Sequence, residues 1–438
     1  MSHEVAGGLA ARCWSFGVRF EYQSRFITGQ PIAMSNARSD QNHETCCRVC
    51  GHPIGSSPLS LGHLPVCNDF SDDGVVDRRV DLDIVECEFC QLVQLRSTAS
   101  ADLLMPRVAW IRYREPEDHL DALAASLLSL RPEAQRAIGT GPFELPLLSR
   151  LGARGLETST LPIGVDAPAG RYPYLESWQT ILNDERLSAA SAQHGTFDIV
   201  SCRYIVEHSP TPVAALRALK HLLSPEGLLL VEVPDSSKFL AARDYCFLWE
   251  EHSCYFVEET LRLLAQASGY RVLTLLRYPG ALEDALVAVL TPSPDAPPLP
   301  MRGASELFRS YRQGFLDQRG QLQSLLRTAA GPNKDGLALF GIGHHAIMFA
   351  NAFGVADMIA LAVDDDPDKA GFFPPGFSVP VVGSERLLAD QRIGTCLFAV
   401  APHIEGRVRD KLAPLAERGV VFRSVYASLN NAITGGLG

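Results

Sequence analysis

The sequence has little of what several protein classes require. Its 438 residues contain 39 Lys and Arg against 50 Asp and Glu, a formal net charge of −11, so the positive footprint of a nucleic-acid-binding protein is missing. No apolar stretch reaches the roughly 18 residues that a membrane-spanning helix needs. The N-terminus also lacks a charged start followed by an unbroken apolar core. We therefore expect a cytoplasmic protein that engages neither nucleic acid nor a membrane.

Cysteine is scarce as well, with 11 in the whole chain, which excludes a disulfide-based scaffold. The odd number suits a reducing compartment. Apolar residues, in contrast, make up 46% of the chain and charged residues 20%, which is typical of a protein that buries full cores. At roughly 150 residues per domain, the length predicts two to four domains. These numbers leave the oligomeric state open.

Alternating polar and apolar segments divide the chain into consecutive parts. Residues 1–44 have weak periodicity and predict a loose N-terminal extension, and residues 45–100 form a compact segment. Over residues 101–290 short apolar runs alternate with helical patterns, which predicts a parallel sheet with crossover helices. Residues 291–330 hold a proline-rich linker and a long helix. Residues 331–438 repeat the strand–helix alternation.

Individual elements follow from the spacing of apolar residues. Residues 118–130, for example, place Leu120, Leu123 and Leu127 on one face of a helix. The other expected helices are 212–223 and 305–326, with a turn at 224–227 after the first of them. The expected strands are 137–139, 197–201, 228–233, 271–276, 337–340, 359–363 and 396–400.

Two CxxC pairs concentrate four of the cysteines in the first compact segment. Cys47 and Cys50 form one pair, and Cys87 and Cys90 form the other. Two such pairs can place four thiolates around a Zn²⁺ ion, and a site with four protein ligands leaves no position for chemistry. A redox function is disfavoured because two pairs occur together without a following helix. The spacing therefore predicts a structural zinc site.

Two segments of the central region combine strand ends with residues suited to chemistry. In Ala137-Ile138-Gly139-Thr140-Gly141-Pro142-Phe143-Glu144, glycines follow the first expected strand, where they allow a nucleotide-like ligand to approach the backbone. This pattern alone also fits an ordinary strand–helix turn. In the second segment, Phe197–Pro212, a buried strand ends in a polar loop that places His208 before a proline-opened helix.

Taken together, the motifs resemble the three-part sugar C-methyltransferases, a family of class I S-adenosylmethionine-dependent methyltransferases. The similarity covers about Cys47 to Ala427. It is carried, in chain order, by the CxxC…CxxC leader with Cys90-Gln91-Leu92-Val93-Gln94-Leu95, by Asp198–Pro234, by Trp249-Glu250-Glu251-His252-Ser253-Cys254-Tyr255-Phe256, and by Asp364-Asp365-Asp366-Pro367-Asp368-Lys369-Ala370-Gly371.

The resemblance implies an α/β fold with a small N-terminal zinc-binding domain, a Rossmann-like methyltransferase core and a second, C-terminal Rossmann-like domain. In that family the three domains enclose a nucleotide-linked keto-deoxysugar, so the expected substrate is a small molecule and the expected cofactor is S-adenosylmethionine. By position in the motifs, the expected catalytic residues are His208, Glu251 and His252, and the expected cofactor-binding residues are Gly139, Thr140, Gly141 and Ser201.

These residue types suit the implied chemistry. Methyl transfer needs an electron-rich acceptor, so the protein must remove a proton from it. A histidine with a pKa near roughly 6.5 can take that proton, and a neighbouring carboxylate can orient the ring or share the proton.

The chain also departs from the family pattern. Ala137 stands where an acidic residue is usual, and Phe143 replaces a third glycine. For the ribose hydroxyls, only Glu157 lies near the second strand, and the family's N-terminal Tyr-x-Tyr pattern is replaced around Val108-Ala109-Trp110, with Tyr113 nearby. These changes keep open an alternative, a binding or scaffold protein that retains the fold but not the cofactor.

A third hypothesis rests on the C-terminal region. Gly341-Ile342-Gly343-His344-His345 follows an expected strand and opens a helix, and Asp364 ends the next strand. Such spacing is a dinucleotide fingerprint and by itself suggests NAD. The resemblance implies instead that this domain closes over the nucleotide-sugar side.

Overall fold

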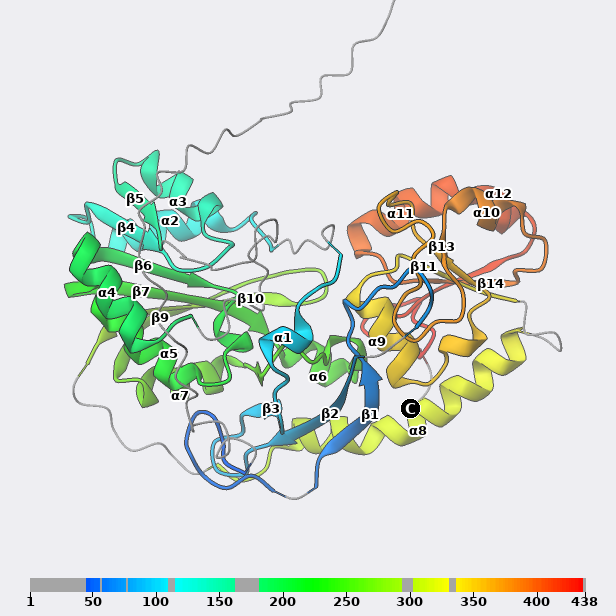
Figure 1. The fold of residues 1–438 in the computed structure, drawn as a ribbon, viewed down its shortest axis with the longest axis horizontal. Coiled ribbons are helices and arrows are strands. Elements are labelled where there is room, and N and C mark those ends of the chain that lie inside the picture. The colour runs from blue at the N-terminus through cyan, green and yellow to red at the C-terminus, as the bar shows by residue number, and fades with distance from the viewer. Residues whose placement is uncertain are drawn as a thin grey trace, which may run out of the picture. The chain divides into compact units, whose positions relative to one another are not determined.

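The computed structural model describes residues 45–55, 57–75, 78–108, 115–161, 181–293, 302–330 and 336–435. The expected extension over residues 1–44 and the segment around Trp110 and Tyr113 lie outside these ranges. Within them the strands form three sheets, of four, six and five strands (Figure 1).

The four-stranded sheet holds the N-terminal region and is antiparallel throughout. Its order is β1-β2-β3-β8, so three strands from the cysteine-containing segment pair with a fourth that comes much later in the chain. A short helix, α1 (Ala101–Leu104), follows β3. The strands are β1 (Leu59–Pro65), β2 (Arg79–Glu86), β3 (Val93–Leu95) and β8 (Cys254–Tyr255).

The six-stranded sheet has the order β5-β4-β6-β7-β10-β9. Its first four strands are parallel, and β10 is antiparallel to both of its neighbours. Because parallel strands end at the same edge, the loops after β4 and β6 lie side by side there. The strands are β4 (Arg136–Gly139), β5 (Glu157–Thr160), β6 (Phe197–Arg203), β7 (Leu223–Asp235), β9 (Tyr270–Tyr278) and β10 (Asp284–Pro292).

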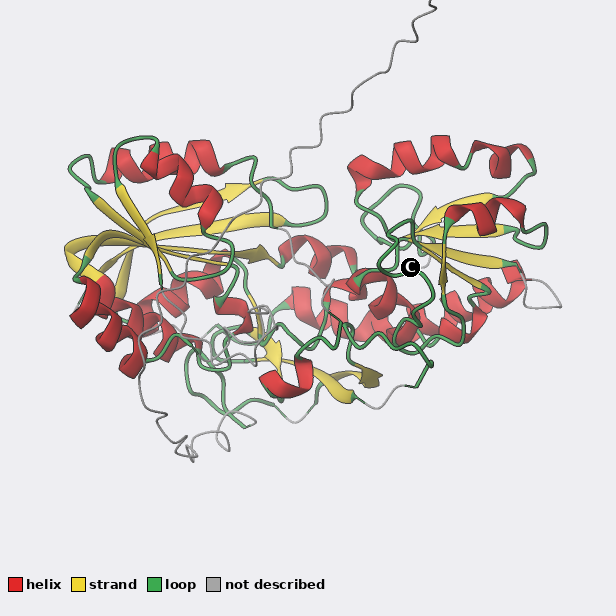
Figure 2. Ribbon diagram, turned by 45° about the horizontal axis from the view of Figure 1, so that its top comes forward, coloured by secondary structure: helices red, strands yellow, loops and turns green. Residues whose placement is uncertain are grey.

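Helices cover both faces of this sheet, as Figure 2 shows. On β6, Ile199 belongs to the apolar cluster of one face and its neighbour Val200 to that of the other, which is the period-two alternation of a strand buried on both sides. The first face is covered by α2 (Leu120–Leu130) and α3 (Leu145–Gly152), and the second by α4 (Asp184–His194), α5 (Pro212–Ala218) and α7 (Glu258–Ala267).

The prediction of a turn at 224–227 is wrong. These residues belong to β7, which starts at Leu223, although its pairing with β6 shifts from Phe197↔Leu223 to Ile199↔Leu228. The chain therefore advances five residues along β7 while it advances two along β6, and residues 224–227 bulge out of the ladder. Turn-forming residues produced an irregularity within the strand because the pairing on both sides of them continues.

The five-stranded sheet is parallel, with the order β13-β12-β11-β14-β15. The long helix α8 (Glu306–Ala330) precedes it and contacts α6 (Ser237–Ala242) and β11. The strands are β11 (Leu337–Phe340), β12 (Leu361–Val363), β13 (Val381–Val382), β14 (Thr395–Phe398) and β15 (Val421–Ser424), and the helices are α9 (His344–Ala352), α10 (Ser384–Ala389), α11 (Pro402–Lys411) and α12 (Ala413–Glu417).

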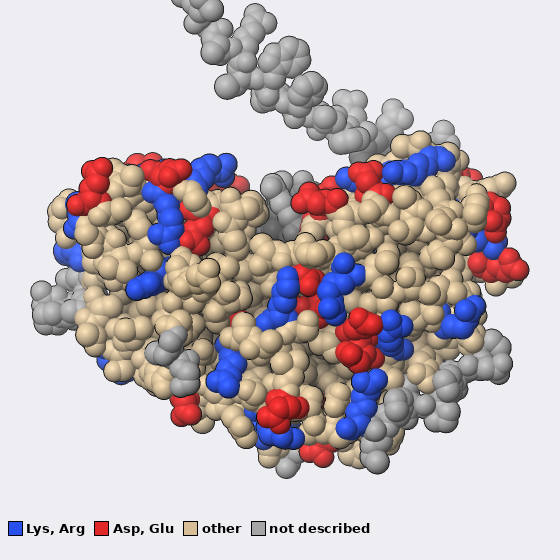
Figure 3. All heavy atoms as spheres, turned by 180° about the vertical axis from the view of Figure 1, so that it is seen from behind, with Lys and Arg blue, Asp and Glu red and all other residues tan. Residues whose placement is uncertain are grey.

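No helix in the described ranges combines the length and the apolar character needed to cross a membrane. On the face shown in Figure 3, basic and acidic side chains are interspersed.

Candidate active site and zinc centre

The four paired cysteines come together, as their spacing predicts. The sulfur atoms of Cys47, Cys50, Cys87 and Cys90 all lie within 4.8 Å of one another. Cys47 Sγ is 3.5 Å from Cys90 Sγ, and Cys50 Sγ is 3.5 Å from Cys87 Sγ. Four sulfurs at about 2.3 Å from a tetrahedral Zn²⁺ would be separated by about 3.8 Å, so these positions fit the ion with little adjustment.

The backbone builds both pairs in the same way. Cys47 accepts a hydrogen bond at its carbonyl from Gly51 N–H, and Cys87 accepts one from Gln91 N–H. Gly51 and Gln91 have φ values of 72° and 65°, in the left-handed region. The cysteine amides in turn donate to the carbonyls of His52 and Leu92. Two equivalent tight turns therefore present their thiols toward each other from opposite sides.

The expected cofactor loop lies at the carboxyl end of β4. Thr140 is fully buried there, and both its N–H and its Oγ1 donate to the carbonyl of Ser201 on β6, each at 2.9 Å. A Cβ atom on Gly139 would lie 2.3 Å from the Cβ of Glu144, and one on Gly141 would lie 2.9 Å from Ile205 Cγ1. The loop is thus packed too tightly against its neighbours for side chains at its two glycines.

Glu144, at the start of α3, supplies a buried carboxylate to this loop. It accepts hydrogen bonds from Ser201 Oγ at 2.6 Å and from the Arg203 amide at 2.9 Å. Burial raises the pKa of Glu144 to about 7, although Arg203 and these donors oppose the shift. Sequence reasoning missed this residue, because the acid lies seven positions after Ala137, where the family's acid is expected.

Arg203 ties the loop to the neighbouring strand. Its guanidinium pairs with Glu232 on β7 and donates to the carbonyl of Phe143 at 2.6 Å. Glu232 is fully buried, lies 2.8 Å from His119 Nε2, and has a lowered pKa because these cationic and hydrogen-bonding partners outweigh the effect of burial. The backbone of Phe143, the residue in the position of the third glycine, is thus held by an arginine of a buried ion pair.

Glu157 does not reach the cofactor edge. It is the first residue of β5, at the opposite end of the strand from the loop, and it is exposed beside Arg136. The segment after β5 lies outside the described residues from position 162 to 180.

The histidines expected to be catalytic lie in contact. His208 ends a 3₁₀ turn, Val206–His208, just beyond the carboxyl end of β6, and its ring centroid is 4.5 Å from that of His252 in an edge-to-face arrangement. Nδ1 of His208 is 3.0 Å from the carbonyl oxygen of Glu251, so this nitrogen carries the proton and Nε2 is the basic atom of the neutral ring.

Burial keeps these rings neutral. It lowers the pKa of His208 to about 4, partly opposed by Glu251, and it lowers the pKa of His252 well below its usual value. Both imidazoles are therefore unprotonated at neutral pH, and the same burial weakens them as bases. Glu207, adjacent to His208, is only 2% exposed, and burial raises its pKa well above the usual range. Burial therefore disfavours the charged form of Glu207 beside the pair.

The Glu251 carboxylate receives side chains from two distant parts of the chain. Its Oε1 accepts a hydrogen bond from Asn68 Nδ2 at 3.3 Å and lies 3.4 Å from Nε2 of His344. Glu251 is 4% exposed and His344 22%. Sequence reasoning did not assign Asn68 or His344 to the site, although the Gly-His-His step of the C-terminal glycine motif was the available signal for His344.

His345 packs beside this group. Its ring centroid is 4.5 Å from Phe247 and 5.0 Å from Trp249, and its Nδ1 lies 3.3 Å from the hydroxyl of Tyr426. Burial lowers the pKa of His345 to about 3. The ring is therefore a neutral packing element between residues 247–249 and the C-terminal sheet.

In the dinucleotide-like motif of the C-terminal sheet, the acidic residue Asp364 already binds other groups of the protein. Asp364 Oδ2 accepts from the Ile342 amide at 2.8 Å and pairs with Lys369 Nζ at 2.7 Å. Lys369 also donates to the carbonyl of Ile342. A ribose would have to displace these contacts, which disfavours the NAD hypothesis.

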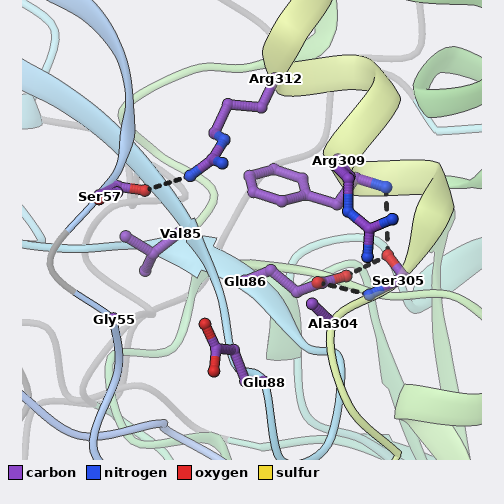
Figure 4. Close-up of a pocket in the computed structure, with 10 residues that line it drawn as sticks. Gly55, Ser57, Val85, Glu86, Glu88, Ala304, Ser305, Arg309 and Arg312 are labelled. Atoms are coloured by element: carbon purple, nitrogen blue, oxygen red, sulfur yellow. Dashed lines mark hydrogen bonds between the residues drawn. The ribbon is translucent and has the colours of Figure 1, made fainter.

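A separate cavity of about 250 Å³ lies between β2 and the start of α8 (Figure 4). Its charged groups already bind protein atoms: Glu86 accepts from the amide and hydroxyl of Ser305, and Arg312 donates to the Ser57 carbonyl. These bonds join the helix to the sheet, which is a structural role.

Comparison with known families places these features in a known order. A zinc binding domain model matches residues 47–104, a methyltransferase domain model matches residues 138–275, and a C-methyltransferase C-terminal domain model matches residues 302–425.

Individual proteins are similar to the whole chain or to part of it. C-methyltransferase NovU of Streptomyces niveus is 25% identical over 395 residues, which cover 78% of this chain and 86% of NovU. A ubiquinone biosynthesis O-methyltransferase of Haemophilus ducreyi is 36% identical over 53 residues, 12% of this chain and 22% of that protein. Among solved structures, the 1,6-didemethyltoxoflavin-N1-methyltransferase of Burkholderia thailandensis is 13% identical, with a TM-score of 0.29 over 40% of this chain and 79% of that one.

Proposed function

The chain belongs to the three-domain C-methyltransferases, which are S-adenosylmethionine-dependent enzymes, and we propose its substrate on that basis. The proposed reaction is methylation of carbon in a nucleotide-linked deoxysugar or a related small metabolite. The observation that carries the proposal is the grouping of His208, His252 and Glu251 just beyond the carboxyl end of β6, one strand away from the glycine loop. A neutral imidazole has a free ring nitrogen, which can take a proton from the acceptor carbon before methylation.

S-adenosylmethionine would be held by the loop Gly139–Gly141, which Ser201 supports from β6 through its bonds to Thr140 and Glu144. The cofactor would supply an electrophilic methyl group on a sulfonium. The two glycines keep this loop free of side chains at the strand end, which is the feature a cofactor loop needs. Glu144 adds a carboxylate close to Gly141, with its Oε1 3.4 Å from the position of a Cβ there. In its ionised form this group favours a ligand that carries positive charge, and such a ligand would in turn lower the pKa of Glu144.

The acceptor's reaction is a proton transfer followed by bond formation. A C–H bond next to a carbonyl breaks, its proton passes to Nε2 of a neutral histidine, and its electron pair stays on the acceptor as an enolate. The carbon then bonds to the methyl group while the carbon–sulfur bond breaks and its electrons return to sulfur. We assign the proton-accepting role to His208 or His252, with Glu251 offsetting the positive charge that the ring gains.

Replacing His252 tests this assignment. We expect His252→Ala to lower turnover at least about tenfold, because the proton acceptor or its neighbour is lost, while calorimetric titration shows nearly unchanged binding of S-adenosylmethionine. The assay uses a nucleoside diphosphate-linked keto-deoxyhexose as the acceptor probe. His221→Ala is a matched control, since His221 is exposed and pairs with Asp184 on the surface. An unchanged rate in the double variant with His208→Ala would contradict the assignment.

The alternative function is a binding or scaffold protein with a degenerate cofactor loop. Ala137 and Phe143 favour it, since both replace residues that the family's loop uses. The same titration separates the two: no heat of binding at millimolar S-adenosylmethionine would favour the scaffold, and saturable binding would favour the enzyme.

A further inference from the structure

The contacts of Glu251 indicate a role for the C-terminal domain in proton transfer. Three regions meet on this carboxylate: Asn68 from the N-terminal region, Glu251 itself from the core, and His344 from α9. Both contacts fall on the same oxygen, Oε1, at 3.3 and 3.4 Å. Asn68 donates a hydrogen bond to this oxygen and His344 Nε2 lies within ion-pair distance of it, so both side chains act on the orientation of the carboxylate.

The two partners of Glu251 differ in chemistry. Asn68 is buried and offers a permanent neutral donor. His344 can offer a donor with or without a positive charge, and with 22% of its side chain exposed it can exchange protons with solvent. Among the described residues that contact Oε1, His344 is therefore the one that is both titratable and partly exposed to water.

The fold holds His344 in this place. It is the first residue of α9, directly after Gly343, and its ring lies 5.4 Å from that of Trp249, two residues before Glu251. The amide end of α9 also carries a partial positive charge, which favours an ionised carboxylate nearby. The ring centroid of His345 also lies 5.0 Å from that of Trp249, so the start of α9 packs against the segment that carries Glu251 and His252.

We propose that His344 is a positioning residue of the reaction: it orients the Glu251 carboxylate, so that the C-terminal domain takes part in the acid–base chemistry. This inference rests on the proposed function. After the acceptor's proton reaches an imidazole of the core, the Glu251 carboxylate stabilises the imidazolium, and His344 keeps that carboxylate facing the pair. The imidazolium then gives its proton to solvent, and the ring returns to its neutral state.

The test follows proton removal and methyl transfer separately. Wild type, His344→Ala and His344→Gln are assayed with a nucleoside diphosphate-linked keto-deoxyhexose, first for exchange of the acceptor's carbon-bound hydrogen in D₂O and then for methylation. We expect His344→Ala to lower both exchange and kcat about tenfold while KM changes less than about twofold, because binding groups are untouched. His344→Gln, which keeps an N–H donor toward Glu251, should recover exchange to within about threefold of wild type.

Controls make each outcome decisive. His403→Ala removes an exposed histidine of α11 and should leave every rate unchanged. The inference is overturned by rates in His344→Ala within about twofold of wild type, by a loss confined to KM, or by a Gln variant no faster than Ala. Thermal unfolding of each variant excludes misfolding. Failure of the proposed function looks different, since wild type itself would then show neither exchange nor calorimetric binding of S-adenosylmethionine.

Discussion

At the scale of single residues, Glu144 is a carboxyl group whose proton affinity depends on folding. Burial raises its pKa to about 7, whereas the same group in an unfolded chain ionises near roughly 4.3. The folded protein therefore binds this proton more tightly, and ionising Glu144 destabilises the fold progressively as pH rises from about 4.3 through 7.

Glu144→Gln should remove this penalty. Glutamine keeps the shape, with one oxygen to accept from the Arg203 amide and an amide group for Ser201 Oγ. We expect the free energy of unfolding, measured with urea, to rise relative to wild type by up to about 3 kcal/mol at pH 8 and to change little at pH 4.5. Ser201→Ala, which removes one donor and leaves the carboxyl group in place, is the comparison. A difference that is the same at both pH values would show that folding does not shift the pKa of Glu144.

At the scale of elements, the two CxxC turns join the N-terminal sheet to the core. Cys47, Cys87 and Cys90 belong to the same buried apolar cluster as Leu216 of α5 and Leu264 of α7. Because a structural zinc site contributes its binding free energy to folding, loss of the metal should destabilise both the N-terminal sheet and the core to which it is joined.

Cys46 offers an adjacent control for this claim. It neighbours Cys47 but lies outside the four-sulfur cluster. We expect purified wild type and Cys46→Ser to contain about one zinc per chain by elemental analysis, and Cys47→Ser to lose zinc and to unfold at a lower temperature. Equal zinc content in both serine variants, or none in wild type, would refute the site.

At the scale of the whole molecule, burial moves proton affinities in opposite directions. It raises the pKa of Glu115 to about 7 and of Glu283 to about 8, and it lowers the pKa of His208 to about 4 and of His345 to about 3. The carboxyl groups favour the folded state at low pH and the histidines favour it at high pH. The free energy of unfolding therefore depends on pH through both kinds of group, and replacing one of them should change that pH dependence measurably.

His345→Phe should shift that balance. The phenylalanine ring would still pack against Phe247 and Trp249, and the imidazole, whose protonation the fold disfavours, is removed. An unfolded histidine takes up its proton below roughly pH 6.5, so wild type loses stability there and the variant does not. Between pH 8 and pH 5 we expect unfolding measurements to show the variant gaining about 2 kcal/mol relative to wild type. A constant difference across this range would mean that His345 titrates normally when folded.

Local patterns in the sequence predicted much of this molecule. The CxxC pairs predicted the sulfur cluster because each pair is built by one tight turn, and the apolar spacing predicted β4, β6, α2 and α8 because neighbours in the chain set the period of each element. The family motifs likewise predicted an enzyme that uses S-adenosylmethionine.

The tertiary structure alone decided which distant groups meet. Glu144 supplies a carboxylate to a loop whose usual acid is absent, Asn68 and His344 bind a carboxylate far from both in sequence, and the residues expected as a turn continue β7. Such contacts carry no periodic signal, since they depend on how sheets and helices pack rather than on nearby residues. The sequence determined the elements and the chemistry available to them, and packing determined which side chains share one site.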